Sequence, residues 1–260
     1  WDFRHIPGLS DLTDAVHLTG AKIAVQLEHA GRQNLGFIDG VQPTAPSPIP
    51  CPVMSAFGGM KPKELTLDEI NEVEDAFATA ALRAKLSGFD AVEIHCAHGY
   101  LLSSFLSLRT NNRTDQYGGN LEGRAKIIVE TIEKIKKTVG SDFPIICRIN
   151  GSDFLPGGYT LEDAKMVAKT VEEAGVSAIS VSAGTYETLE WIIQPSYFQR
   201  GCLLDSALEI KKSVSIPTIA VGRINDPLLA DRILVDGKSD LVAMGRALLT
   251  DPELPLKVAQ

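Results

Sequence analysis

The sequence has 260 residues, of which 44% are hydrophobic and 22% are charged, and its formal net charge is −8. This composition is typical of a globular protein with enough apolar material for one large core. The acidic balance argues against nucleic acid or an anionic membrane surface as the main partner, and no apolar run approaches the roughly 20 residues of a membrane span.

Short apolar, β-branched runs recur along the chain and are typical of parallel strands that are buried on both faces. A short helix at Leu12–Leu18 is predicted to precede the first of them. The six predicted strands are Ile23–Leu27, Ala91–Ile94, Pro144–Cys147, Ala178–Val181, Pro217–Val221 and Leu241–Met244.

Amphipathic helices are predicted between the strands. The capping box Thr66-Leu67-Asp68-Glu69 opens a helix that reaches about Ser87. The following helices are expected to end at Gly140, to run from Thr160 to Gly175, and to begin at Asp226-Pro227.

Alternating strands and helices predict an α/β fold with a parallel sheet. The connections that leave the strands are long in 30–64, 99–119 and 183–202. Long loops at the C-terminal ends of strands are typical of a (β/α)8 TIM barrel, which builds its active site from them. Because about six of the eight βα units are visible, we expect residues 1–260 to form a partial barrel that lacks the first two strands. An open six-stranded sheet is the competing interpretation.

The last two predicted strands are each followed by a glycine and an arginine, Gly222-Arg223 and Gly245-Arg246. Glycine lets the backbone approach an anion closely, the following helix start offers free N–H groups, and arginine adds a bidentate cation. In barrels, the loops after strands seven and eight commonly bind phosphate. The pattern therefore predicts a phosphate site, with two glycine turns beside surface arginines as the alternative.

Gln26 and Arg148 are polar residues at the ends of two other predicted strands. Either one alone is more often a core or salt-bridge residue. The combination is more informative: the amide of Gln26, the cation of Arg148 and a phosphate clamp suit a phosphorylated aromatic cofactor.

His95, Cys96, His98 and Tyr100 gather at the end of the strand that begins at Ala91. Zinc is one interpretation of two histidines and a cysteine, but His95 and Cys96 are adjacent and should point apart. A structural pair of core histidines is a second. In the third, two imidazoles donate hydrogen bonds to one developing oxyanion while the phenol supplies a proton. No metal site is expected.

The cysteines are widely scattered and form no paired motif. This pattern predicts buried free thiols in a cytoplasmic protein. They are Cys51, Cys96, Cys147 and Cys202.

Several long motifs resemble the Old Yellow Enzyme family of NADH:flavin oxidoreductases, and in particular its 2,4-dienoyl-CoA reductase and enoate reductase branch. The resemblance covers essentially the whole chain, with the motifs in the expected order. The segments are QLEHAGRQ (26–33), GFDAVEIHCAHGYLLSSFLS (88–107), NNRTDQYGGNLEGR (111–124), AVGRI (220–224) and LVAMGRALLTDP (241–252).

The resemblance implies a TIM barrel that binds FMN noncovalently and takes NAD(P)H as its reductant. Gln26 would pair with the pyrimidine edge of the flavin, and Arg148 would lie near N1 and C2=O. The implied phosphate-binding residues are Gly222, Gly245 and Arg246, with Arg223 as a neighbour.

The resemblance also implies a catalytic set for reducing an activated alkene. His95 and His98 would hold the activating carbonyl, and Tyr100 would protonate the α-carbon after hydride reaches the β-carbon. An unperturbed tyrosine, with a pKa of about 10, stays protonated at neutral pH and suits this role.

The expected partner is a small α,β-unsaturated substrate, with neither nucleic acid nor membrane, and a homo-oligomer is an open alternative to a monomer. Members of the dienoyl-CoA reductase branch continue into a [4Fe-4S] cluster and an FAD-binding domain, which we expect in the full-length protein and not in this chain. The alternatives are an incomplete flavin-barrel fragment without activity, a binding module without turnover, and another phosphate-binding barrel. No predicted strand ends in lysine, which argues against a Schiff-base aldolase.

Overall fold

The computed structural model describes residues 2–38 and 40–259, and a parallel sheet of six strands organises them. The strands are β1 (Ala24–Leu27), β4 (Ala91–Cys96), β5 (Ile145–Asn150), β6 (Ala178–Ser182), β7 (Thr218–Ala220) and β8 (Leu241–Val242). They lie side by side in chain order, and every neighbouring pair is parallel. A doubly wound sheet reverses its strand order at a switch point, whereas this order never reverses. The winding is therefore that of a barrel.

All six predicted strands form, but their ends differ from the prediction. β4 continues to Cys96 and β5 continues to Asn150, so that His95 and Arg148 lie within strands and not just after them. β8 is shorter than predicted and ends at Val242.

Helices connect successive strands, and the first four of them pack in chain order against one another. They are α3 (Leu67–Leu86), α5 (Leu121–Val139), α6 (Leu161–Ala174), α8 (Leu204–Lys211) and α9 (Pro227–Val235). The predicted capping box forms at Thr66, and the helix predicted to begin at Thr160 has one as well. In each, the threonine hydroxyl accepts a bond from the third helical N–H and the acidic side chain there reaches back. α5 and α6 end at Gly140 and Gly175, as predicted.

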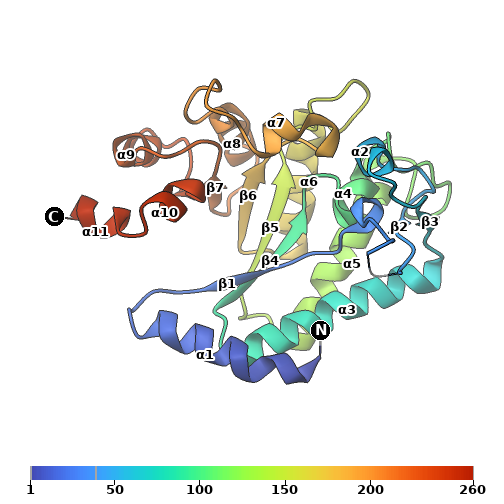
Figure 1. Cartoon of the computed structure of the whole chain (residues 1–260), viewed down its shortest axis with the longest axis horizontal. Coiled ribbons are helices and arrows are strands. Elements are labelled where there is room, and N and C mark those ends of the chain that lie inside the picture. Colours follow the sequence, from blue (N-terminus) through green and yellow to red (C-terminus); the bar gives the residue numbers. More distant parts are fainter. Residues whose placement is uncertain (1, 39, 260) are drawn as a thin grey trace.

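The first helices lie at the N-terminal end of the sheet. η1 (Phe3–His5) leads into α1 (Ile6–His17), which begins before the predicted Leu12 because Pro7 is accommodated in its first turn. In Figure 1, α7 (Leu189–Ile192) lies at the end of the sheet to which β5 points, and α1 lies at the opposite end. Asp90 accepts bonds from His17 and Lys22, which fixes α1 beside β4.

The long connections contain elements that the sequence did not predict. Residues 30–64 hold η2 (Gly31–Gln33), β2 (Thr44–Ala45), α2 (Pro52–Ala56) and β3 (Lys63–Glu64), with β2 paired to β3. The connection after β4 contains α4 (Leu101–Leu106), all of whose residues are buried and therefore show no apolar–polar period. The connection after β6 contains η3 (Tyr186–Thr188) and α7, and the chain continues after β8 with α10 (Arg246–Thr250) and α11 (Leu254–Ala259).

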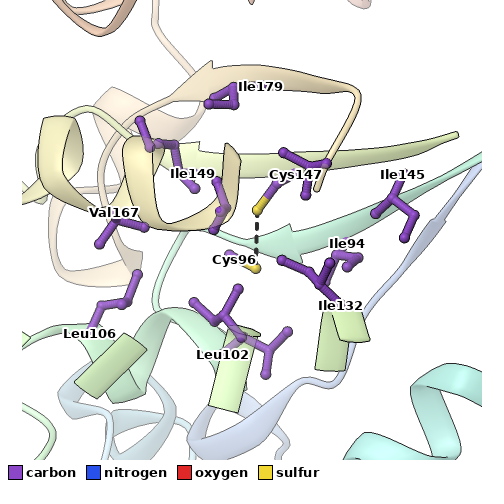
Figure 2. Close-up of a cluster of buried hydrophobic side chains, with 14 of the residues drawn as sticks. Ile94, Cys96, Leu102, Leu106, Ile132, Ile145, Cys147, Ile149, Val167 and Ile179 are labelled. Carbon is purple, nitrogen blue, oxygen red and sulfur yellow. Dashed lines mark hydrogen bonds between the residues drawn. The ribbon is translucent and has the colours of Figure 1, made fainter. Parts of the chain in front are cut away.

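One face of the sheet packs against the helices and forms the core. Figure 2 shows Cys96 and Cys147 within this cluster, with their Sγ atoms 3.6 Å apart. Burial raises the pKa of the Cys96 thiol well above its ordinary value. The prediction of buried free thiols is confirmed for Cys51, Cys96 and Cys147, whereas Cys202 is partly exposed. Within residues 2–38 and 40–259, no helix combines the length and the apolar character needed to cross a bilayer.

Candidate active site

The other face of the sheet is polar, because the side chains of a strand alternate between its two faces. Register places cross-strand neighbours on the same face. Gln26 is the neighbour of Glu93, and His95 is the neighbour of Arg148. Arg148 in turn pairs with Ser180, and Asn150 pairs with Ser182. A run of polar side chains thus crosses β1, β4, β5 and β6 on the face away from the helix-packed core.

His95 is buried in β4 and has one ring nitrogen engaged by the backbone. The Ala97 N–H donates to Nδ1 of His95 at 3.2 Å. A neutral imidazole whose Nδ1 accepts a bond carries its proton on Nε2. Burial, and secondarily the positive charge of Arg148, lowers the pKa of His95 to about 3, so this ring is neutral at physiological pH and presents Nε2–H as a donor.

His98 follows β4 in a left-handed backbone conformation, with φ at +63°. Its N–H donates to Asn150 Oδ1 at 3.2 Å, and its carbonyl accepts from Gln33 Nε2 at 2.7 Å. Such a conformation is uncommon outside glycine and persists where the surroundings fix it. Gly99 continues the tight turn at φ +78°, where a Cβ atom would lie 2.6 Å from Gln33 Nε2.

The ring of His98 completes a pair with His95. The two ring centroids are 4.9 Å apart and nearly perpendicular, and Nε2 of His98 lies 2.6 Å from Ser182 Oγ. Burial, followed by the nearby His95 and Arg148, lowers the pKa of His98 to about 2. Both imidazoles are therefore neutral hydrogen-bonding groups and not cations.

Tyr100 precedes α4, and its ring packs edge-on beside the two histidines. Its ring centroid lies 4.9 Å from that of His95 and 6.4 Å from that of His98. Its hydroxyl lies 3.1 Å from the hydroxyl of Tyr186. Burial, with the hydrogen bond to Tyr186 and the charge of Glu28, raises the pKa of Tyr100 above its ordinary value, so the expectation of an unperturbed phenol is wrong, and the proton is held more firmly than predicted.

The three predicted residues His95, His98 and Tyr100 are thus brought together as one cluster. Two neutral imidazoles can donate to an oxygen that gains negative charge, and a protonated phenol beside them can give up a proton. The structure keeps the three aromatic rings within 6.4 Å of one another, measured between centroids.

Arg148 lies between this cluster and a cavity of about 690 Å³. Its Nη2 donates to Ser182 Oγ at 3.2 Å, whereas its Nε is buried without a hydrogen-bond partner among the described residues. Arg148 and Ser182 line the same cavity as both predicted glycine–arginine pairs. The lining includes Arg148, Ser182, Gln194, Gly222, Arg223, Asn225, Gly245 and Arg246.

The two glycine–arginine pairs differ in detail. Gly245 directly precedes α10, which begins at Arg246, whereas Gly222 is separated from α9 by Arg223 and the residues up to Pro227. A helix start follows each pair, and α9 begins at Asp226-Pro227 as predicted, a short loop after the first pair. Arg246 donates to the Gln194 carbonyl at 2.8 Å, and Arg223 donates to the carbonyl of Phe198, so the connection after β6 positions both guanidinium groups beside the cavity.

Gln26 lies on the same polar face but on the outer strand β1. Its Nε2 donates to Glu93 Oε1 at 2.5 Å, and it is not among the residues that line the cavity. Its assignment to a cofactor stays a prediction.

The structure adds three residues that the sequence analysis missed, Asn150, Ser182 and Tyr186. A signal for the first two is present, since Arg148 and Asn150 alternate with apolar residues in IICRIN, as do Ser180 and Ser182 in AISVS. Tyr186 belongs to a long connection, where no periodicity marks it.

The zinc interpretation fails on geometry. Cys96 packs in the helix-side core (Figure 2), whereas His95 projects from the opposite face, as their adjacency predicted. Among the residues that the structure describes, no three His, Cys, Asp or Glu side chains converge as metal ligands would.

Known proteins match the chain along its whole length. A family model described as the NADH:flavin oxidoreductase / NADH oxidase family matches residues 1–260. An NADH oxidase from Thermoanaerobacter brockii is 47% identical over 260 residues, which cover 100% of this chain and 39% of that protein. A cinnamate reductase from Clostridium sporogenes is 37% identical over 265 residues, covering 96% of this chain and 39% of that protein.

Solved structures agree in fold. A 2-naphthoyl-CoA reductase in complex with 2-naphthoyl-CoA superposes with a TM-score of 0.93 at 32% identity, covering 98% of this chain and 40% of that chain. An old yellow enzyme homologue from Zymomonas mobilis gives 0.80 at 28% identity, covering 99% and 72%. These matches confirm the (β/α)8 barrel, with about six of its eight βα units in this chain, over the competing open sheet. The chain spans about two fifths of the length of the NADH oxidase and the cinnamate reductase.

Proposed function

Because the chain belongs to the NADH:flavin oxidoreductase / NADH oxidase family, we propose that it uses FMN and NAD(P)H to reduce the activated C=C bond of an α,β-unsaturated carbonyl compound. The observation that carries this proposal is the cluster of His95, His98 and Tyr100. It brings two neutral imidazoles and a protonated phenol close enough together to act on one substrate. A relative named cinnamate reductase supports the same substrate class, since cinnamate is an α,β-unsaturated carboxylate.

The residues present fit FMN. The cavity of about 690 Å³ has the size of a cofactor site, and the unpartnered Nε of Arg148 points to a missing acceptor. Arg148 would lie beside the flavin ring, and Gly222, Arg223, Gly245 and Arg246 would hold the phosphate. Gln26 would pair with the ring edge through the amide atoms that Glu93 leaves free.

The chemistry that FMN supplies when bound is hydride transfer, first from NAD(P)H and then to the β-carbon of the alkene. His95 and His98 bind the carbonyl oxygen of the substrate and stabilise the negative charge that develops there. Their low pKa values keep them neutral, so they donate hydrogen bonds without giving up their protons.

Tyr100 protonates the α-carbon. Its raised pKa keeps the proton in place until a carbanion-like centre forms beside it. Tyr186, whose hydroxyl is 3.1 Å away, can donate to the phenolate that remains and so assist reprotonation from solvent.

The longer relatives extend the proposal beyond this chain. We propose that the remaining two barrel strands, a [4Fe-4S] cluster and FAD belong to other parts of a longer protein, because this chain covers 39% of the NADH oxidase. The substrate within the unsaturated class, which includes enoyl-CoA esters, enoates and cyclic enones, is set by the long connections after the strands.

The test is a visible absorbance spectrum of the purified chain after FMN is added and the excess is removed. An oxidised-flavin spectrum that NAD(P)H bleaches without oxygen, and that an enone, an enoate or an enoyl-CoA restores, is the expected result. Flavin that NAD(P)H bleaches but no unsaturated carbonyl restores would contradict alkene reduction. A chain that retains no flavin would favour the alternative of an incomplete, inactive flavin barrel.

A further inference from the structure

Ser182 is a buried hydroxyl in β6 that joins two residues of the site. It is 2% exposed, and its Oγ lies 2.6 Å from His98 Nε2 and 3.2 Å from Arg148 Nη2. Its register partner Asn150 fixes the backbone of His98. Ser182 is therefore placed to control the ring of His98 in the same way that Asn150 controls its main chain.

The hydrogen-bonding capacities of the three groups determine where the protons lie. A guanidinium only donates, so Ser182 Oγ accepts from Arg148. The single hydroxyl proton then has His98 Nε2 as its acceptor, which leaves the proton of the neutral imidazole on Nδ1.

The opposite arrangement is disfavoured. With a proton on Nε2, His98 would donate to Ser182, whose oxygen would then accept two bonds while its own proton lacked an acceptor. The side chain of Ser182 has no further hydrogen-bond partner among the described residues. Leaving a buried hydroxyl proton without an acceptor is unfavourable, and this favours the tautomer in which Ser182 donates to His98.

We propose that Ser182 is a positioning residue that holds His98 as the Nδ1–H tautomer, so that His98 and His95 each direct a free N–H at the same oxygen of the substrate. His95 is fixed in the opposite tautomer by the Ala97 N–H at 3.2 Å. The remaining nitrogens, Nε2 of His95 and Nδ1 of His98, have no hydrogen-bond partner among the described residues. The two rings therefore present one unoccupied donor each.

The direct test needs no substrate and no flavin. Long-range ¹H–¹⁵N spectra of the uniformly ¹⁵N-labelled chain at neutral pH distinguish protonated from unprotonated ring nitrogens, and the chain has only five histidines to assign. Loss of one set of signals in His98→Gln identifies His98. We expect Nδ1 protonated and Nε2 unprotonated in His98, with the reverse in His95. A His98 ring protonated on Nε2 would overturn the proposal without any further variant.

Two substitutions test the role of the hydroxyl. Ser182→Ala is expected to shift His98 toward the Nε2–H tautomer, because Nε2 loses its donor, whereas Ser182→Thr keeps the hydroxyl and the tautomer. His17, whose Nε2 lies 2.8 Å from Asp90 Oδ2, is an internal control that neither change should affect. An unchanged His98 tautomer in a folded Ser182→Ala chain would contradict the proposal.

The consequence for the substrate rests on the function proposed above. In the FMN-loaded protein, Ser182→Ala should weaken the binding of 4-nitrophenol about tenfold, the equivalent of one hydrogen bond, and Ser182→Thr should restore it. Equal affinity for 4-nitrophenol in the natural chain and both variants would contradict a role of the His98 tautomer in binding the substrate oxygen. If His98 is the Nδ1–H tautomer but the protein reduces no alkene, the proposed function is wrong and the role of Ser182 in setting the tautomer stands.

Discussion

One face of the sheet packs Ile94 and Cys147 against the helices, whereas the other face carries His95 and Arg148 at the next positions of the same two strands. His95 and Ile94 are both buried and Arg148 is partly buried, yet the two faces make opposite contributions to the free energy of unfolding. The apolar face gains free energy as its side chains leave water. The polar face loses free energy, because it buries two imidazoles that must stay neutral and an arginine Nε without a partner.

Within a single strand, the side chains on the helix side therefore serve stability and those on the polar side serve chemistry. A substitution on the helix side should change the free energy of unfolding, and one on the polar side should change binding or turnover. The predictions below test how cleanly the two faces divide these roles.

The largest effect is expected at Tyr100 on the polar side. Tyr100→Phe removes the proton donor and should slow the alkene half-reaction about 10²–10⁴-fold, while reduction of bound flavin by NAD(P)H continues. Stopped-flow absorbance measures the two half-reactions separately. The control Tyr197→Phe alters an exposed ring and should change neither. Equal slowing of both half-reactions by Tyr100→Phe would remove the acid assignment.

The next largest effect is expected on the apolar side. Ile149→Ala empties part of the core around β5, where Ile149 is fully buried, and should lower the free energy of unfolding by about 3 kcal/mol. Urea unfolding measures it, and the exposed Val235→Ala is the matched control. A loss below about 1 kcal/mol would mean that the core tolerates the cavity and that the division between the faces is weaker than proposed.

A smaller effect is expected at the phosphate end of the cavity. Arg246→Ala should weaken FMN binding about tenfold, because a charge-assisted hydrogen bond to phosphate is lost from a largely exposed position. Quenching of flavin fluorescence during titration measures the affinity. Arg232→Ala removes the same charge from α9, away from the cavity, and should leave the affinity as it was. No difference between the two variants would contradict the clamp.

The smallest effect concerns a charged exception within the helix layer. Glu74 of α3 is 2% exposed, and burial raises its pKa to about 7, with Glu130 adding to the shift and Lys134 opposing it. The folded chain thus holds a proton that the unfolded chain releases at lower pH. The free energy of unfolding should therefore fall as the pH rises from about 4.5 to 7 and stay lower above it.

Glu74→Gln removes this titration. Relative to the natural chain, the variant should gain stability between pH 5 and pH 8, by on the order of 1 kcal/mol. Urea unfolding at the two pH values measures the change, and Glu72→Gln on the exposed side of α3 is the control. A difference that is constant or shrinks with rising pH would mean that Glu74 is ionised throughout this range.

Local sequence patterns were sufficient for the six strands of the sheet, for several of the helices between them and for part of the site. Thr66 and Thr160 mark two helix starts, the first through a predicted capping box, and Gly140 and Gly175 mark two helix ends. His95, His98 and Tyr100 could be grouped from the sequence because His95 lies at the end of β4 and the other two follow within four residues of the strand. These features depend on residues a few positions apart, whose geometry the backbone of a strand or helix fixes.

The sequence by itself therefore determined the alternation of strands and helices, the glycine–arginine pairs, and the histidine–tyrosine cluster. Only the tertiary structure decided that Ser182 bonds both His98 and Arg148. It likewise decided that Tyr186 reaches Tyr100 and that the connection after β6 holds Arg246. The reason is physical: these contacts depend on strand register and on how distant connections fold back, and both are set by the packing of the whole core rather than by neighbouring residues.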